Sequence, residues 1–286
     1  MTKKLLIILG PTAVGKSDFA IAKAQQLHSP IINCDSRQIF REMKIGVARP
    51  SEEQLAAVQH YMIANHSVEE HYTAGIFELE AMALLQELFK DHDTLVMTGG
   101  SGFYIDALCD GLDDFPPSEL QIRSELMRRM DTEGIESLQR QLEQLDPESY
   151  HSIDIANRQR VVRALEVTIA TGRKFSSFKT SPAKQRPFQI EKIGLTRERE
   201  ALYARIDARV EKMMEEGLEQ EARSLAGYRD LPALNTVGYK ELFDYFDGKY
   251  PLEEAERLIK RNTRHYAKKQ MTYWRRDISI NWIKLD

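Results

Sequence analysis

The fold of this 286-residue chain is decided by its N-terminal stretch, Lys4-Leu5-Leu6-Ile7-Ile8-Leu9-Gly10-Pro11-Thr12-Ala13-Val14-Gly15-Lys16-Ser17. The apolar run 4–9 is short and ends at a glycine, so it predicts a buried strand. Apolar residues recur at helical spacing over 17–27, which predicts a helix. The segment between them fits the pattern G-x-x-x-x-G-K-[ST], and a preceding strand with a following helix is the context that indicates a phosphate-binding loop.

The residue types of this loop explain why it would bind phosphate. Gly10 and Gly15 let backbone N–H groups converge on an anion without Cβ clashes, and the following helix adds its positive N-terminal end. Lys16 supplies a charge to the phosphates, and the Ser17 hydroxyl is a Mg²⁺ ligand. The alternative is a glycine turn with a chance Lys-Ser. The loop predicts a di- or triphosphate site without revealing the reaction.

The alternation of strands and helices continues after the loop. Residues 30–34 and 94–97 predict further buried strands, and 78–89 predict a helix. This pattern is typical of an α/β protein, here with a P-loop NTPase-like parallel-sheet core. Ligands of such folds bind at the carboxyl ends of the strands.

The second half of the chain is mainly helical by pattern. Residues 113–118 resemble a linker and 176–187 a loop, while 190–195 predict a strand. Helices are expected over 119–145 with a break near Gly134, over 161–170, 199–223 and 252–276. We therefore expect a catalytic core built from 1–114 and 187–286, interrupted by a helical insertion domain, 115–186.

Composition excludes several classes of protein. With 42% hydrophobic residues and a net charge of −4, the chain has the composition of a globular protein rather than a disordered one. Two cysteines rule out a disulfide scaffold and a four-cysteine zinc site. No apolar run approaches the ~20 residues of a membrane span, and the apolar run after Lys3 and Lys4 is too short for a signal peptide. We expect a cytoplasmic enzyme.

Charge is spread unevenly along the chain. Residues 257–286 hold nine Lys/Arg and two acids, whereas the other 256 residues carry a net charge of −11. No acid occurs in 257–276, so we expect no intrahelical ion pairs there, and Tyr266, Tyr273 and Trp274 are interleaved. The pattern favours a polyanionic partner such as RNA; the alternative is a solvated helix face.

The acid of the predicted site stands in an unusual place. A plain P-loop hydrolase would show an aspartate at the end of a later strand to hold Mg²⁺, but 94–97 run into Thr98-Gly99-Gly100-Ser101-Gly102. The nearest acid by pattern is Asp35, after the second strand. It could accept a proton from a nucleophile, or it could cap the next turn; position alone does not decide.

At this point the sequence resembles the tRNA dimethylallyltransferases (tRNA isopentenyltransferases) over nearly its whole length. The resemblance is carried by an ordered set of motifs: 10–17, Asp35-Ser36-Arg37-Gln38, Ile45-Gly46-Val47-Ala48-Arg49-Pro50, Gly99 to Tyr104, Asn157 to Glu166, Thr171-Gly172-Arg173, Arg205 to Arg209, Val237-Gly238-Tyr239-Lys240, and Thr263 to Gln270 with Thr272 and Trp274. The phosphate loop alone is shared by many enzymes, whereas the ordered set is specific.

The resemblance implies a reaction at carbon rather than phosphorus. The family transfers a dimethylallyl group from dimethylallyl diphosphate to N6 of the adenosine 3′-adjacent to the anticodon, in tRNAs that read codons beginning with U. The products are N6-(dimethylallyl)adenosine and diphosphate. The implied partners are the tRNA anticodon stem-loop and dimethylallyl diphosphate, the implied cofactor is Mg²⁺, and we expect a monomer with no membrane contact.

The resemblance also implies a role for each matching residue. Asp35 would be the general base on N6, Ser101 would hydrogen-bond near the same amine, and Arg209 would stabilise the leaving diphosphate. The implied diphosphate-binding residues are Gly10, Thr12, Ala13, Val14, Gly15, Lys16 and Ser17, with Ser17 as Mg²⁺ ligand. The implied tRNA-binding residues are Asp35, Ser36, Arg37, Gln38, Ser101, Arg123, Gln159, Arg160, Val161, Val162, Arg163 and Lys240, with the insertion domain binding tRNA.

Several alternatives stay open. Arg209 has Asp207 and Glu211 as neighbours, so local ion pairing competes with diphosphate binding. The arginines near 158–163 could form a solvated face, and Cys34 is interpreted as a core residue. A P-loop nucleoside kinase with a helical lid is the alternative function. Phe40, Arg49 and Ser101 replace the family's usual Tyr, Lys and Thr, which leaves the contact at Ser101 open.

Overall fold

A computed structural model describes residues 2–113, 115–179 and 184–286 of the chain. These residues form two compact units, Met1–Cys109 with Arg186–Asp286, and Asp110–Gln185. The boundaries lie within five residues of those expected at 114 and 187. Residue 114 and part of the expected loop 176–187 lie outside the described ranges.

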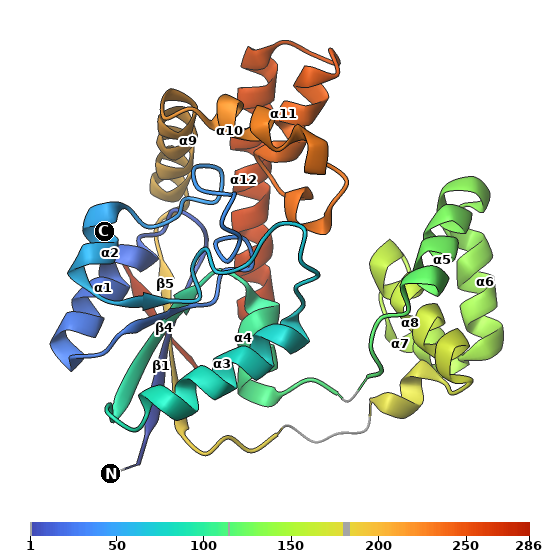
Figure 1. Ribbon diagram of the computed structural model, residues 1–286, viewed down its shortest axis with the longest axis horizontal. Coiled ribbons are helices and arrows are strands. Elements are labelled where there is room, and N and C mark those ends of the chain that lie inside the picture. The colour runs from blue at the N-terminus through green and yellow to red at the C-terminus, as the bar shows by residue number, and fades with distance from the viewer. Residues whose placement is uncertain (1, 114, 180–183) are drawn as a thin grey trace. The chain divides into compact units, whose positions relative to one another are not determined.

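The first unit is built on one six-stranded parallel sheet (Figure 1). Its strands are β1 (Lys4–Leu9), β2 (Ile31–Asn33), β3 (His60–Tyr61), β4 (Thr94–Gly99), β5 (Gln189–Thr196) and β6 (Ile280–Lys284), in the order β3-β2-β4-β1-β5-β6. Leu5 of β1 lies opposite Leu95 of β4 and Ile190 of β5. Because strand order reverses about β1, a crevice opens beyond its carboxyl end. The parallel α/β core is as predicted.

Helices complete this unit, some packed against the sheet and others against neighbouring helices. They are α1 (Lys16–Leu27), α2 (Glu52–Ala57), α3 (Ala74–Leu88), α4 (Gly102–Asp110), α9 (Arg199–Glu215), α10 (Leu218–Ser224), α11 (Tyr239–Phe246) and α12 (Leu252–Trp274), with short 3₁₀ turns at Ala226–Tyr228 and Pro232–Leu234. The prediction of one helix over 199–223 was wrong. Gly217 adopts φ 102° between α9 and α10, and this left-handed conformation ends a helix.

The second unit is a small helical domain. It contains α5 (Leu120–Glu133), α6 (Ile135–Leu145), α7 (Pro147–Ser152), α8 (Arg158–Thr171) and a 3₁₀ turn, Phe175–Phe178. The predicted break at Gly134 and the predicted end of α8 at Gly172 are both confirmed, and both glycines have positive φ. Leu126, Met130, Leu138, Leu142, Val161, Val162 and Leu165 form its core.

None of the helices in the described ranges combines the length and apolar character that a membrane crossing requires.

Candidate active site

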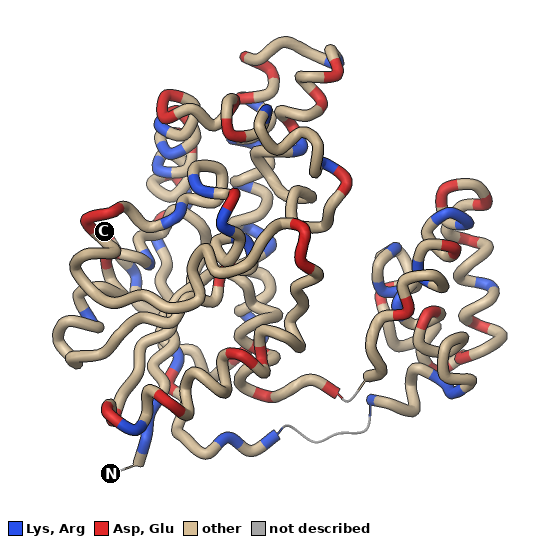
Figure 2. The backbone as a smooth tube through the Cα atoms, in the orientation of Figure 1, with Lys and Arg blue, Asp and Glu red and all other residues tan. Residues whose placement is uncertain are grey.

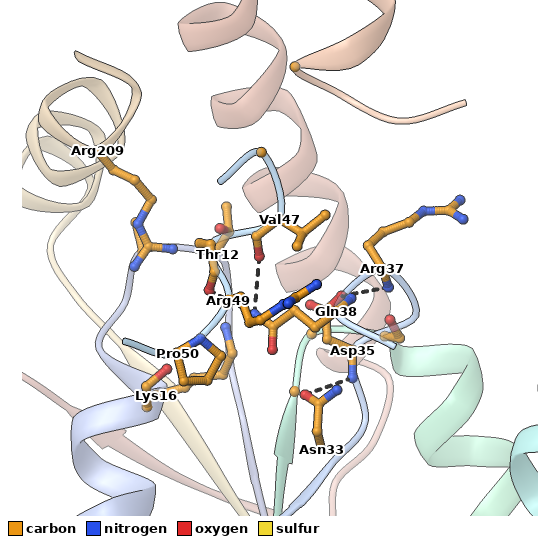
Figure 3. A pocket seen from close by; sticks show the side chains of 18 of the residues that line it. Thr12, Lys16, Asn33, Asp35, Arg37, Gln38, Val47, Arg49, Pro50 and Arg209 are labelled. Carbon is orange, nitrogen blue, oxygen red and sulfur yellow. Dashed lines mark hydrogen bonds between the residues drawn. The ribbon is translucent and has the colours of Figure 1, made fainter. Parts of the chain in front are cut away.

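A cleft of about 1560 Å³ opens in the first unit at the carboxyl ends of β1, β2 and β4 (Figure 3). The phosphate loop forms one wall, and residues 35–38, 44–50 and 98–104 form others. Helices α9 and α12 contribute further lining residues, among them Arg209 and Gln270. The cleft therefore brings together segments from the two ends of the chain.

The predicted phosphate loop lies between β1 and α1, the context that its sequence predicts. Gly10 adopts φ 150°, and a Cβ there would lie 2.7 Å from the carbonyl oxygen of Leu195, so only glycine fits. Helix α1 begins directly after Gly15, and no side chain caps its first turn. Its first N–H groups are thus available to an anion.

Lys16 is held inside this loop. Its ammonium donates to the carbonyl oxygens of Gly10 and Pro11, each at 2.9 Å. Burial, together with the positive charge of Arg209, lowers the pKa of Lys16 to about 8, although Asp35 opposes the shift. A bound polyanion would restore the charged form, because opposite charge favours it.

Two arginines support the loop from outside. Arg205 of α9 donates its Nε–H to the carbonyl oxygen of Ala13, and Arg197 donates its Nε–H to that of Val14, both at 2.9 Å. Ala13 itself has φ 64°, a conformation that is rare for a residue with a Cβ. Sequence reasoning missed both arginines as site residues.

Arg209 faces the cleft without a local acid partner. Its two acidic neighbours are engaged elsewhere: Asp207 pairs with Arg264, and Glu211 pairs with Lys260 at 2.7 Å. Among the described residues Arg209 has no ion pair, so the local-pairing alternative is not observed. Burial and the nearby Arg205 lower the pKa of Arg209, as expected for a cation held near other cations until an anion binds.

Asp35 caps the following turn, which is one of the two roles that the sequence left open. Its Oδ1 accepts the N–H of Arg37 at 2.9 Å and of Gln38 at 3.4 Å, as a turn cap does (Figure 3). The N–H of Asp35 donates to Asn33 Oδ1 at 3.3 Å. Its other carboxylate oxygen, Oδ2, lies 3.6 Å from where a Cβ on Gly100 would stand. One oxygen is thus used for structure, and the other borders the cleft.

Ser101 lies beside the Asp35 segment. The hydroxyl of Ser101 accepts the N–H of Ser36 at 2.9 Å. Gln38 donates its amide to the carbonyl oxygens of Val47 and Ala48, at 3.1 and 2.9 Å. The Gln38 amide group therefore holds the 44–50 loop in place, which the sequence did not reveal. Ser36, Arg37 and Lys240 also line the cleft.

The residues that would hold Mg²⁺ fit a phosphate-bound ion rather than a protein cage. The described residues contain no cluster of three or more His, Cys, Asp or Glu that could bind a metal. Mg²⁺ usually keeps several waters and takes its other ligands from one or two side chains and the phosphates. Ser17, in the first turn of α1 and lining the cleft, fits this role.

The predicted tRNA-binding residues of the second unit divide into two groups. Gln159 and Arg160 are exposed on α8. Val161 and Val162 are 0% exposed in the core of the unit, so the prediction that they contact tRNA is wrong for their side chains. They occupy the buried face of an amphipathic helix.

Arg123 and Arg163 are engaged inside the second unit. Both pair with Glu166, which is 1% exposed, at 3.0 and 2.9 Å. Arg123 also donates to Gln159 Oε1 at 2.5 Å. These arginines stabilise a buried carboxylate, a role that the sequence analysis did not assign to them.

The basic C-terminal helix is partly neutralised. The prediction that it has no intrahelical ion pairs was wrong, because Lys260 pairs with Glu256 at 2.7 Å and Arg257 with Glu254 at 2.6 Å. Figure 2 marks the Lys and Arg positions of this segment in blue. In the part of the chain that is described, no acidic partner is found for Arg261, Lys268, Lys269 and Arg275.

Cys34 is fully buried, and burial raises the pKa of its thiol, which confirms it as a core residue.

Sequence reasoning also missed Gln270 and Glu221. A signal existed for Gln270: Ala255, Ile259, Ala267 and Trp274 place the buried face of α12, and Gln270 falls on it. A polar residue on a buried stripe needs a partner.

Comparison with known proteins finds a matching family. The profile of the family described as IPP transferase matches residues 38–277. A tRNA dimethylallyltransferase of Porphyromonas gingivalis is 52% identical over 279 residues, covering 98% of this chain and 93% of the relative. A tRNA dimethylallyltransferase of Bacteroides thetaiotaomicron is 46% identical over 98% of this chain and 91% of the relative.

Solved structures show the same fold. The tRNA isopentenylpyrophosphate transferase of Bacillus halodurans superposes with a TM-score of 0.73 at 34% identity, covering 99% of this chain and 91% of that one. A eukaryotic dimethylallyltransferase acting on tRNA superposes with a TM-score of 0.82 at 25% identity, covering 99% of this chain and 74% of that one.

Proposed function

Since the chain belongs to the IPP transferase family, we propose that it is a tRNA dimethylallyltransferase. It transfers a dimethylallyl group from dimethylallyl diphosphate to N6 of the adenosine 3′-adjacent to the anticodon, in tRNAs that read codons beginning with U. The observation that carries the proposal is the single cleft in which an Asp35 carboxylate oxygen and an anion-binding loop lie together.

In the proposed reaction, one side of the cleft acts on the amine and the other on the diphosphate. A bond forms between N6 and the allylic carbon, while the bond from that carbon to the diphosphate oxygen breaks. Asp35 takes the proton that N6 loses, because an aromatic amine is a weak nucleophile until it sheds that proton. Ser101, which is bonded to the Ser36 N–H, orients the same amine.

The departing diphosphate develops charge that the opposite side stabilises. Lys16 and Arg209 line the cleft, and the N–H groups at the start of α1 have no side-chain cap, so all three would stabilise that charge. Such preorganised donors act most strongly where water is excluded. When bound, Mg²⁺ would neutralise part of the diphosphate charge, held by Ser17 and the diphosphate oxygens.

The acceptor in this proposal is tRNA rather than a free nucleotide. Exposed cations on α12, Lys268 and Lys269 among them, suit the phosphates of an RNA strand, as does the exposed Arg160 of the second unit. The target adenine must leave its stack to reach the cleft. We further propose that the protein acts as a monomer in the cytoplasm, where tRNA is used.

The proposal is tested by a single incubation. The protein is mixed with Mg²⁺, dimethylallyl diphosphate and unmodified tRNA, and the digested tRNA is analysed by mass spectrometry. A dimethylallyl adenosine from the position beside the anticodon is expected. ATP turnover on a free nucleoside, with no tRNA product, would instead identify a kinase. A product on free AMP but not on tRNA would reject tRNA as the acceptor.

A further inference from the structure

Gln270 of α12 joins two loops of the cleft that lie far apart in the sequence. Its Oε1 accepts the N–H of Thr12 in the phosphate loop at 2.9 Å. Its Nε2 donates to the carbonyl oxygen of Gly100 at 2.9 Å. Gln270 is only 6% exposed, and its bond to Gly100 is buried, which strengthens that bond.

The contact at Gly100 is close-fitting. A Cβ on Gly100 would lie 2.6 Å from Gln270 Nε2 and 3.6 Å from Asp35 Oδ2. Glycine at this position lets the Gln270 amide approach the backbone. The Gln270 amide and the Asp35 carboxylate therefore border the same residue, directly before Ser101.

The polar atoms of Gln270 are largely occupied by the protein itself. Its amide oxygen and one N–H of its amide nitrogen are bonded to backbone groups, and the Tyr266 hydroxyl is a further hydrogen-bond partner of the side chain. The Thr12 N–H is likewise occupied, because it donates to Gln270. A bound anion would therefore be held by the other backbone N–H groups of the loop and by Lys16. The two backbone bonds link Gln270 directly to both loops, and this link is the route by which it would affect the reaction.

We propose that Gln270 is a positioning residue for prenyl transfer. It fixes the phosphate loop, which carries the leaving group, relative to the Gly100–Ser101 segment, which faces the attacking amine. The inference rests on the proposed function. Transfer needs the amine nitrogen, the allylic carbon and the leaving oxygen in line, and a misplacement of about 1 Å can cost ~10²-fold in rate.

The test measures binding and chemistry separately in Gln270→Leu. Single-turnover transfer at saturating dimethylallyl diphosphate and tRNA is expected to slow by at least ~30-fold. The Kd values for tRNA and for inorganic pyrophosphate with Mg²⁺ are expected to stay within about threefold of wild type, because no ligand contact is removed. This split between rate and binding distinguishes positioning from a general loss of structure.

A second variant covers the case in which Gln270→Leu does not fold. Gln270→Glu keeps an acceptor for the Thr12 N–H but places a carboxylate oxygen against the Gly100 carbonyl. It is expected to show the same loss of single-turnover rate, since the link needs both bonds.

Asn262→Leu is the matched control. Asn262 also lies on α12, and its amide donates to Glu241 Oε1 at 2.6 Å, away from both loops. This variant is expected to lower Tm while keeping the wild-type transfer rate.

Two results would overturn the proposal. One is a transfer rate within about twofold of wild type in a folded Gln270 variant. So small a change in rate is less than misplacement of the reacting groups would cause. The other is a rate loss in Asn262→Leu equal to that in the Gln270 variants at equal loss of Tm. Failure of the proposed function is distinguishable, because the wild-type protein would then bind pyrophosphate but give no dimethylallyl adenosine.

Discussion

The phenol of Tyr239 donates a hydrogen bond to Glu221 Oε1 at 2.6 Å. The same carboxylate accepts three backbone N–H groups, those of Lys44, Ile45 and Gly46, at 2.8–2.9 Å. Tyr239 is fully buried, and burial and the adjacent Glu221 raise the pKa of its hydroxyl, so it remains a donor. One carboxylate thus fixes the loop that forms a wall of the cleft.

Glu221→Gln is therefore expected to destabilise the protein by ~1–3 kcal/mol, since an amide NH₂ would oppose groups that themselves donate. Thermal unfolding of the variant measures the effect. Glu219→Gln is the control on the same helix: Glu219 pairs with the exposed Arg223, so ~0–1 kcal/mol is expected. Equal losses in the two variants would contradict this role of Glu221.

Asp35→Asn separates the two roles of that carboxylate. Asparagine keeps an oxygen for the Arg37 N–H but cannot take a proton from N6, so single-turnover transfer is expected to fall by ~10²–10⁴-fold. The tRNA Kd, measured by filter binding, is expected to stay near wild type because the turn is preserved. Near wild-type turnover would show that Asp35 is not the base.

Lys16 predicts a pH dependence of diphosphate binding. Its pKa of about 8 in the free site means that the ammonium loses its proton as pH rises through 8. Binding of pyrophosphate favours the charged form, so affinity is expected to fall between about pH 7 and 9, with proton uptake on binding. Calorimetry at pH 8.5 in two buffers of different ionisation enthalpy measures the uptake. Lys16→Met should bind weakly at every pH, without the proton uptake of wild type.

Arg205→Ala tests the support of the phosphate loop. Removing the donor to the Ala13 carbonyl loosens a segment held at φ 64°, and the KM for dimethylallyl diphosphate is expected to rise about tenfold, the cost of a charge-assisted bond near 1.5 kcal/mol. The tRNA Kd should not change. Arg199→Ala is the control on α9, because Arg199 stacks over the Tyr203 ring and makes no bond to the loop. A KM that rises equally in both variants would argue against loop support.

The second unit offers a contrast between two arginines of α8. Arg163→Ala removes a partner of the buried Glu166 and is expected to lower stability by ~1–3 kcal/mol. Arg160→Ala, at an exposed position, is expected to leave Tm unchanged and to weaken tRNA binding. The salt dependence of log K should then fall by ~0.7–0.9 for the lost phosphate contact. An unchanged tRNA Kd in Arg160→Ala would remove that residue from the RNA surface.

Local pattern predicted much of the fold for clear physical reasons. The apolar run 4–9, the glycine loop and the 17–27 periodicity are signals carried by neighbouring residues, and β1 and α1 follow them. The strand at β6 and the helices at α4 and α11 gave weaker signals because they are short. Helix 199–223 was overextended, since a glycine inside a periodic segment does not reveal its φ.

The candidate site was predicted only in part. Thr12, Ala13 and 15–17 of the loop line one cleft together with Asp35, Ser101 and Arg209, but their roles stay predictions. Val161 and Val162 fall within a family motif, but they also lie on the buried face of the helix that this motif forms. The partners of Arg123 and Arg163 could not be predicted, because Glu166 becomes a buried acceptor only when α5 and α8 pack.

The sequence by itself determined the phosphate loop, the parallel α/β core and the family to which the chain belongs, because these depend on contiguous residues. Only the tertiary structure decided which distant groups share a hydrogen bond. Gln270 reaches Thr12 across 258 positions of the chain, and Arg205 reaches Ala13 across 192. Such pairs form because the sheet brings the ends of β1, β4 and β5 together. Local sequence patterns do not reveal contacts between residues so far apart in the chain.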